Sequence, residues 1–384
     1  MIHISSTMAR KIHLCPCIRN LLFLLFLTIA GSSVYGCDNP SEKPDYPSGE
    51  KPMISAIRWD AWTGGEITVQ VEKTLGPAKY HHRLPWFSKI ISENQVVIDG
   101  SPQEVMDREI EWAASSGIDY WAILVYPEGS SMSGAIKQYM KSPVRSKVKF
   151  CMILSNTMNS SAGDWISERN RIKEYILDPN YQKVMNGRPL LYVFNAENII
   201  KNHMNRIEEL RAIFKREGVD PYWVFMGWNP ANDWVKAKEA GFDAVTCYAY
   251  GGSQATFDDF SAAAEEKYWS KADQAGAAQV PLVTSGWDKR PRIDHPVSWE
   301  PKTSESYHSR TDWPPPPKPG ELAGHLKRAI SFVSLHPGSC ESKAILIYAW
   351  NEYDEGGWIA PTLGKDGLPD TGRLDAIRKV LTEK

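Results

Sequence analysis

Residues 344–352 read AILIYAWNE, an apolar run that ends in polar and aromatic side chains. Seven runs of the same kind come earlier in the chain, at residues 53–60 (MISAIRWD), 119–127 (DYWAILVYP), 149–156 (KFCMILSN), 189–195 (PLLYVFN), 222–229 (YWVFMGWN), 243–250 (DAVTCYAY) and 281–288 (PLVTSGWD). Short apolar runs that alternate with longer helical segments are typical of βαβ units around a parallel sheet. Eight such units predict an α/β protein with a single (β/α)8 TIM barrel over residues 53–384.

The segments between these runs are helical in pattern. We expect helices at residues 102–116, 165–177, 205–217, 233–240, 257–275, 320–335 and 372–382. Several of them end at a glycine, as in Glu217-Gly218 and Ala240-Gly241, which is a common way for a helix to end.

Two connections are too long to be simple turns, residues 61–101 after the first strand and residues 289–319 after the seventh. Loops of this length are usually functional. The second contains most of WPPPPKPG, residues 313–320, whose prolines stiffen the chain. We expect this segment to form one wall of a cleft, and a passive surface loop is the alternative.

The start of the chain has the pattern of an export signal. Arg10, Lys11 and Arg19 precede the apolar run LLFLLFLTIA at residues 21–30, which is too short to span a membrane as a mature helix. Small residues then lead to Cys37, so residues 1–36 resemble a bacterial lipoprotein signal with lipidation at Cys37. Ordinary secretion with a chance cysteine is the alternative.

The residues after the signal are polar and rich in proline. Residues 37–52 cannot bury a core and are expected to form a flexible tether. We therefore expect an exported protein that is held by a lipid anchor at the outer or the cytoplasmic membrane, in the periplasm or on the cell surface.

The composition excludes several classes of function. With 42% hydrophobic and 23% charged residues, the chain is a globular protein rather than a disordered one. A net charge of −2 supplies no positive field for phosphates, so a nucleic-acid partner is not expected. The chain holds 15 Trp, 16 Tyr and 11 Phe, many beside polar residues, and flat aromatic faces in a wet cleft suit sugar rings.

No cofactor or metal is expected. Removal of the signal and lipidation of Cys37 would leave three isolated cysteines, which give neither a disulfide framework nor a zinc site: Cys151, Cys247 and Cys340. The sequence has no GxGxxG, P-loop or GxSxG motif. Adjacent His81 and His82 do not readily converge on one ion, so a metal there is less expected than contact with a substrate.

Nearly every apolar run finishes in aromatic or hydrogen-bonding side chains. In an eight-stranded barrel, the carboxyl ends of all strands meet on one face, where active sites are built. The candidate substrate-binding residues at or just beyond these ends are Trp59, Asp60, Trp62, Tyr126, Asn156, Asn195, Trp228, Tyr250, Trp287, Asp288, Trp350, Asn351 and Trp358. Generic polarity of strand ends is the alternative explanation.

The densest cluster of chemical groups is YAWNEYDEGGW, residues 348–358. Hydrolysis of a glycosidic bond needs two carboxyl groups in different protonation states, one to give a proton and one to act as base or nucleophile. Glu352 and Glu355 would share one face of a helical turn, whereas Asp354 would point elsewhere. Carboxylates this close raise each other's proton affinity. A solvated acidic loop is the alternative, but it would not require the flanking aromatic residues.

The segment AWNEYDEGGWIAPT, residues 349–362, resembles the terminal-strand signature of glycoside hydrolase family 99 and of family-99-like domains, and it is similar to family 71. The resemblance implies that Glu355 is the general acid and that Glu352 acts as base on the 2-hydroxyl of the substrate. It also implies that Trp350 and Asn351 position the pair. Asp354 stands where family 99 typically has histidine.

A conventional inverting mechanism remains open, with Asp60, Glu197 or Asp288 as the partner acid. The expected function is a glycoside hydrolase that cleaves a poly- or oligosaccharide. The expected linkage is that of an α-mannoside or of an α-glucan. The alternatives are a surface glycan-binding lipoprotein without catalysis and a glycosyltransferase-like enzyme. Export counts against the transferase, because nucleotide-sugar donors are cytoplasmic.

Overall fold

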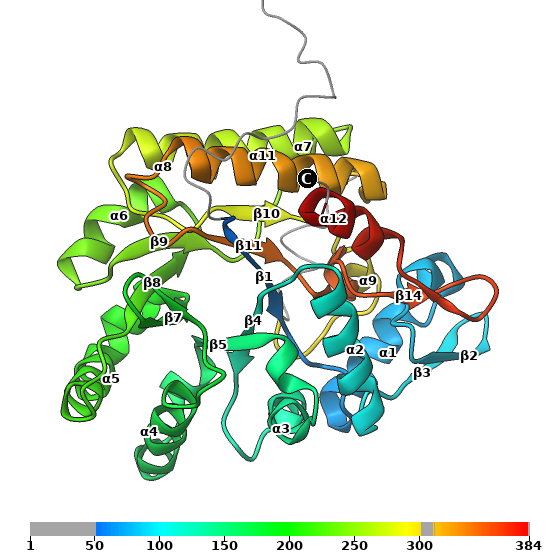
Figure 1. The fold of residues 1–384 in the computed structure, drawn as a ribbon. Coiled ribbons are helices and arrows are strands. Elements are labelled where there is room, and N and C mark those ends of the chain that lie inside the picture. Colours follow the sequence, from blue (N-terminus) through cyan, green and yellow to red (C-terminus); the bar gives the residue numbers. More distant parts are fainter. Residues whose placement is uncertain (1–50, 301–309, 311, 383–384) are drawn as a thin grey trace, which may run out of the picture. The chain divides into compact units, whose positions relative to one another are not determined.

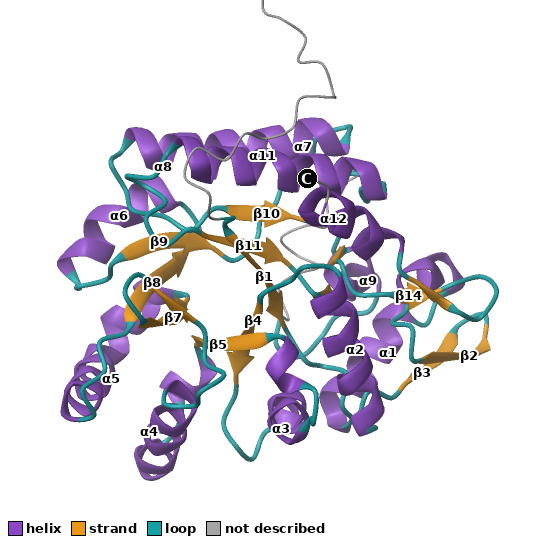
Figure 2. Ribbon diagram, viewed as in Figure 1, coloured by secondary structure: helices purple, strands orange, loops and turns teal. Residues whose placement is uncertain are grey.

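The computed structural model describes residues 51–300, 310 and 312–382. Its centre is a sheet of eight parallel strands that curves into a barrel (Figures 1 and 2). The strands are β1 (Met53–Arg58), β4 (Tyr120–Val125), β5 (Lys149–Leu154), β7 (Arg188–Phe194), β8 (Tyr222–Gly227), β9 (Ala244–Cys247), β10 (Leu282–Thr284) and β11 (Ala344–Tyr348). Each of the eight predicted runs forms one of these strands.

The barrel closes almost completely. The strand order is β10-β11-β1-β4-β5-β7-β8-β9, so β9 and β10 are the two edges of the sheet. Val245 of β9 joins the segment before β10 by a parallel bridge to Gln279, with bonds to Ala278 O (2.8 Å) and from Val280 N (3.0 Å). The predicted single (β/α)8 barrel is therefore confirmed.

The strands are apolar on both faces because both faces are covered. All six residues of β4, YWAILV, are buried. Side chains that alternate along such a strand pack into the barrel interior or against the outer helices, which is why parallel strands lack the apolar-polar alternation of exposed sheets. Inside the barrel, the hydroxyls of Tyr120 and Tyr192 satisfy one another at 3.2 Å.

Helices surround the barrel (Figure 2). The main ones are α2 (Gln103–Ser115), α3 (Gly134–Lys141), α4 (Ala162–Ile176), α5 (Ala196–Arg216), α6 (Pro230–Glu239), α7 (Phe257–Ala264), α8 (Lys271–Gln274), α11 (Pro319–Leu335) and α12 (Gly372–Thr382). Every predicted helix is present, but three differences stand out. Helix α3 was not predicted, α5 begins well before residue 205 and is kinked at His203, and a π-helical turn (Glu265–Ser270) separates α7 from α8.

The long connection after β1 is a folded excursion rather than a loop. It contains α1 (Gly65–Leu75) and a hairpin of β2 (Ser88–Ser92) and β3 (Gln95–Ile98), which lie beside the barrel in Figure 1. Leu84 O accepts a hydrogen bond from Leu363 N at 2.8 Å, in the short pair of β14 (Thr362–Leu363) and β15 (Pro369–Asp370). The excursion therefore docks on the chain that follows the eighth strand.

The long connection after β10 holds the short helix α9 (Arg290–Asp294). Within the described residues, Cys151, Cys247 and Cys340 are buried, and none of them forms a disulfide. None of the helices in this part of the chain is long and apolar enough to cross a membrane. The expected signal, Cys37 and nearly all of the tether lie outside the described residues.

Candidate active site

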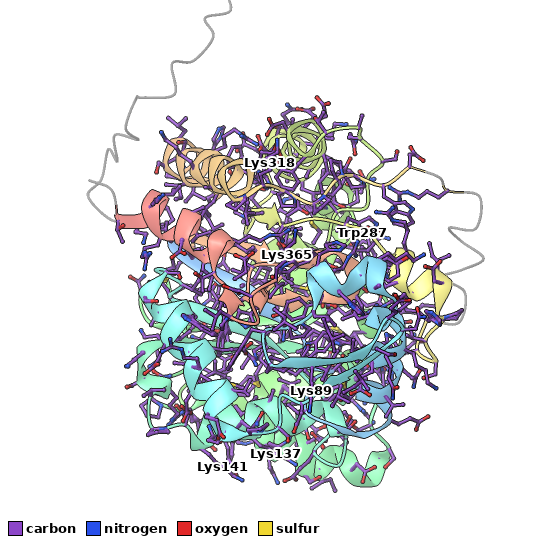
Figure 3. All side chains as sticks on the ribbon, turned by 90° about the vertical axis from the view of Figure 1, so that its right-hand side faces the viewer. Lys89, Lys137, Lys141, Trp287, Lys318 and Lys365 are labelled. Atoms are coloured by element: carbon purple, nitrogen blue, oxygen red, sulfur yellow. The ribbon has the colours of Figure 1, made fainter. Side chains whose placement is uncertain are left out.

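A cleft of about 290 Å³ opens at the carboxyl ends of the strands. Each of the eight strands supplies at least one lining residue at its carboxyl end or from the segment just beyond it: Trp59, Tyr126, Asn156, Phe194, Trp228, Tyr248, Trp287 and Glu352. Leu124, Ser155, Lys289, Arg292, Trp299, Glu300 and Glu355 complete it. The cleft thus combines the predicted carboxyl pair with seven aromatic rings. Trp287, labelled in Figure 3, comes from the segment that follows β10.

A tight turn after β11 brings Glu352 and Glu355 to the same side. Strand β12 (Asn351–Glu352) pairs with β13 (Gly357–Trp358) in an antiparallel ladder, and a 3-10 turn (Tyr353–Glu355) joins them. In a 3-10 helix, side chains three residues apart eclipse one another. The spacing of the two glutamates therefore points both carboxyl groups into the cleft, whereas Asp354 points away from it and is fully buried.

Two glycines let the loop after β10 pack closely on this turn. Gly286 has φ 133° and Gly356 has φ 82°, in the region that favours glycine. A Cβ at Gly286 would lie 2.2 Å from Gly356 O, so no larger residue fits without movement of the backbone. Beside this contact, Asp288 N donates to Glu355 O at 2.6 Å. The backbone thus fixes the turn that carries the glutamates against the neighbouring loop.

Glu352 is buried in a setting that favours its neutral form. Its side chain accepts a hydrogen bond at Oε1 from the Tyr248 hydroxyl (2.5 Å), while Oε2 has no hydrogen-bond partner among the described residues. Burial, and then the nearby charge of Glu355, raise the pKa of Glu352 well above its usual range. The guanidinium of Arg292, 3.7 Å from Oε2, opposes this shift without cancelling it.

Glu355 sits among cations instead. Its Oε1 accepts from Nη1 of Arg292 and lies 3.1 Å from Nζ of Lys289. Its Oε2 accepts from the Tyr348 hydroxyl at 2.5 Å. Both oxygens are therefore engaged, and two glutamates three residues apart have different surroundings, as acid-base chemistry requires.

Arg292 links the acids of the site. It lies 2% exposed, with Cζ 5.1 Å from the ring centroid of Trp59. Besides Glu355, it donates to both oxygens of Asp354 (2.7 and 3.0 Å) and to Glu300 (3.1 Å). Burial disfavours the charge of Glu300, but Arg292 and Lys289 outweigh it and lower the pKa of Glu300 to about 2.

Asp60 and Asn351 lie behind the cleft rather than in its lining. Asp60 is paired with Arg58 at 3.1 Å, and Arg58 also pairs with Glu109 at 2.7 Å. Asn351 accepts from Trp59 N (2.9 Å) and donates to Asp60 (3.3 Å). This buried polar network holds the turn after β11 against the end of β1, so both residues support the site without reaching it.

The remaining predicted residues are also outside the lining. Trp62 packs its edge on Tyr353, and Trp350 packs on Trp121 in the core. Asn195 lies at the start of α5, and Tyr250 packs against Phe260 and Tyr268. Asp288 lies between Arg83 and Arg290. Trp358 lines a second pocket, and Glu197 forms an exposed pair with Lys236. The structure thus brings Trp59, Tyr126, Asn156, Trp228, Trp287 and the two glutamates together.

Several lining residues were not singled out from the sequence. Phe194 is the last residue of β7, and Tyr248 directly follows β9, so their position at a strand end was the available signal. Lys289, Arg292, Trp299 and Glu300 come from the long loop after β10, where no periodic pattern shows which side chains turn inward. Their role in the site depends on tertiary packing.

A resident metal has no obvious ligand set here. Over residues 51–300, 310 and 312–382, no group of three or more His, Cys, Asp or Glu side chains is placed to hold an ion. His81 uses Nε2 in a contact of 2.7 Å with Gly76 O, and His82 lines the second pocket. The acidic side chains of the cleft are instead balanced by Arg292 and Lys289.

Comparison with known proteins shows a shared fold. A structure of the GH99 endo-α-mannosidase from Bacteroides thetaiotaomicron in complex with bis-tris-propane is similar at a TM-score of 0.53 and 14% identity, over 85% of this chain and 95% of that one. A second structure of the GH99 endo-α-mannosidase from this organism matches at 0.53 and 12% identity, over 86% and 96%. No family model and no curated protein matches the sequence.

Proposed function

We propose that this protein is a glycoside hydrolase whose carboxyl pair is Glu352 and Glu355. The observation that carries the proposal is that both carboxyl groups line one aromatic cleft at the carboxyl ends of the strands, in different electrostatic surroundings. One protonated and one ionised carboxyl group beside a bound sugar are what glycosidic cleavage needs. The barrel shared with two endo-α-mannosidase structures supports this choice.

The pair would work in its singly protonated state. In the free protein, burial and the charge of Glu355 raise the pKa of Glu352. The resemblance to family 99 assigns proton donation to Glu355 and the base role to Glu352, so Glu355 would carry the shared proton when the substrate is bound. Because the two arrangements carry the same total charge, the pH profile belongs to the pair rather than to either residue.

The substrate we propose is a neutral poly- or oligosaccharide with an α-mannoside linkage, and an α-glucan is the second choice. The aromatic lining supports a sugar ligand, because Trp and Tyr rings give sugar rings flat apolar faces. Trp228 is the most accessible of these rings, at 50% exposure, and packs its edge against Phe194. It would form a stacking platform at the rim.

We also propose that the protein acts outside the cytoplasm, held at a membrane through lipid on Cys37. The support is the sequence alone, since a basic segment, a short apolar run and small residues lead to this cysteine. A polar tether after Cys37 would leave the barrel free to reach an external glycan.

A product screen tests the proposed activity. The purified chain and the Glu352→Gln/Glu355→Gln double variant are incubated with mannans, α-glucans and host or plant glycans, and released oligosaccharides are analysed by mass spectrometry. Release by the wild type alone supports the hydrolase and identifies the substrate class. Equal release by the double variant would remove the pair from the mechanism.

One observation favours a second candidate, a surface glycan-binding protein without catalysis. Both oxygens of Glu355 are already engaged by Arg292, Lys289 and Tyr348, which would suit a carboxylate with a structural role. The same screen separates the two functions. Binding of a glycan by wild type and double variant alike, with release by neither, would favour the binding protein.

A further inference from the structure

A second pocket, of about 220 Å³, shares no lining residue with the carboxyl-pair cleft. Three features that stand out in the sequence but lie outside the cleft meet in it: His82, Trp358 and the prolines of WPPPPKPG. Arg373, near the start of α12, also lines this pocket. Residues from three distant parts of the chain, at positions 82, 316–319 and 358–373, therefore converge on one pocket.

Arg373 uses only one of its three guanidinium nitrogens for hydrogen bonds within the described residues. Its guanidinium lies over the Trp358 ring, with Cζ 3.9 Å from the ring centroid. Nη1 donates to Trp358 O (2.5 Å) and to Ser285 O (3.3 Å). Nε and Nη2 have no hydrogen-bond partner among the described residues, and no carboxylate there forms an ion pair with Arg373. The free Nε and Nη2 make up one edge of the planar fork, the edge that binds an oxyanion through two parallel bonds.

Two charged side chains act on Arg373, the guanidinium of Arg83 and the carboxylate of Asp370. A second guanidinium, that of Arg83, lies 6.0 Å from the Trp358 ring centroid. Among the described residues, the acid partner of Arg83 is Asp288, which also pairs with Arg290. Burial and the charge of Arg83 lower the pKa of Arg373 to about 9, against the opposing charge of Asp370. The pocket lining thus holds one guanidinium, that of Arg373, and one carboxylate, that of Asp370, which forms no ion pair with Arg373 among the described residues.

We propose that this pocket binds an anionic sugar through its carboxylate or sulfate oxygens, which the Nε–Nη2 edge of Arg373 holds in a bidentate contact. The side chains of Thr362 and His82, which also line the pocket, are further hydrogen-bonding groups for the sugar. Pro316 and Pro317 form an apolar wall of the kind that packs against the ring. The proposal does not rest on the proposed function, because the site would exist whether or not Glu352 and Glu355 catalyse a reaction.

Calorimetric titration of the purified full chain tests the proposal. The probes are glucuronate, galacturonate, N-acetylglucosamine 6-sulfate and neutral glucose. We expect at least one anionic probe to bind at least about tenfold more tightly than glucose, because a charged bidentate contact is lost with the neutral sugar. Stronger binding of the two uronates would identify a carboxylate ligand, and stronger binding of the sulfated sugar a sulfate ester. Equal affinity for all four probes would overturn the proposal.

Variants of helix α12 supply the matched control. Arg373→Gln removes the charge and the fork, and we expect it to weaken binding of the preferred probe at least about tenfold. Arg373→Lys keeps the charge without the fork and is expected to recover only part of the affinity. Arg378→Gln, at an exposed position of the same helix, should bind as the wild type does. Unchanged affinity in Arg373→Gln would also refute the site.

A measurement on the wild type guards against a variant that fails to fold. The indole signal of Trp358, assigned through a Trp358→Phe spectrum, should shift on addition of the preferred probe in a nitrogen-proton NMR titration. Signals of Trp59 and Trp228, which line the cleft, should stay in place. Shifts confined to Trp59 and Trp228 would place the anion in the cleft and reject the second pocket.

Discussion

Asp354 and Arg292 form a buried, two-bond ion pair directly behind the carboxyl pair, with Nε to Oδ2 at 2.7 Å and Nη2 to Oδ1 at 3.0 Å. The same guanidinium contacts Glu355 and approaches Glu352. Asp354 therefore acts on the glutamates through Arg292, because it fixes the plane of the guanidinium between them. An aspartate at this position has a structural partner that a histidine would not hold in the same way.

Removal of Asp354 should be costly to stability. We expect Asp354→Asn to lower the free energy of unfolding by about 3 kcal/mol, because it leaves a buried cation short of one partner. Denaturant unfolding measures the change. The exposed pair Asp375–Arg378 gives the control, and Asp375→Asn should cost about 1 kcal/mol or less. A loss of the same small size in both variants would show that the buried pair adds nothing beyond a surface contact.

The two glutamates should differ in their dependence on the leaving group. If Glu355 is the proton donor, Glu355→Gln should lose turnover of natural glycans by about 100-fold or more, yet retain turnover of an aryl glycoside whose phenol leaves without a proton. Glu352→Gln should lose turnover of both substrates. Steady-state kinetics with the two substrates checks this expectation. The reverse pattern would assign proton donation to Glu352, the residue with the raised pKa.

The rim tryptophan should contribute affinity without contributing stability. Trp228→Ala removes a half-exposed ring, so we expect KM or Kd for the glycan to rise roughly tenfold, from the loss of a stacking contact. The melting temperature should change little. Leu335→Ala, which removes an exposed apolar side chain from α11, should leave affinity unchanged. Wild-type affinity in Trp228→Ala would exclude the stacking platform.

Asp288 should make stability depend on acid pH. Burial favours its neutral form, but Arg290 and Arg83 outweigh burial and lower its pKa from 3.8 to about 2. Between these values the unfolded chain binds the proton and the folded chain does not, so this stabilisation is present above about pH 4 and is lost as the pH falls toward 2. The difference in unfolding free energy between wild type and Asp288→Asn should shrink by roughly 2 kcal/mol over this window. A difference that stays constant from pH 5 to pH 2 would contradict it.

The predicted lipid anchor can be tested without an assay of enzymatic activity. Cys37→Ser should abolish incorporation of labelled palmitate and move the protein from the membrane fraction to the soluble exported fraction, because no thiol remains to carry the lipid. Cell fractionation with immunoblotting measures this shift. Replacement of the buried Cys340 by serine should leave the membrane fraction unchanged. Palmitate incorporation that persists in Cys37→Ser would reject lipidation at this position.

The strands were predictable because burial on both faces gives each a continuous apolar run. This is why β4 and β11 coincide closely with their predicted segments. The carboxyl pair was also accessible, since its spacing depends on one local turn. Helix α3 was missed because its eight residues, GAIKQYMK, mix polar and apolar side chains without a clear boundary signal.

The surroundings of the pair could not be read in the same way. Arg292 and Glu355 are 63 positions apart and meet only because the loop after β10 packs on the turn after β11. Asp60 lies two residues beyond the end of β1, where it pairs with Arg58, the last residue of the strand. The position of a side chain at a strand end therefore did not decide which residues reach the cleft. Local patterns locate elements, whereas partners across loops depend on tertiary packing.

The contact between Gly286 and Gly356 has a thermodynamic consequence. The backbone there joins the loop that carries Trp287, in the cleft, to the turn whose Trp358 lines the second pocket. A ligand that displaced this backbone from one side would change the affinity for a ligand on the other side. Thermodynamic linkage makes such an effect reciprocal. If an anionic sugar in the second pocket changes the affinity of the cleft for its ligand by some factor, the cleft ligand changes the affinity of the second pocket for the anionic sugar by the same factor.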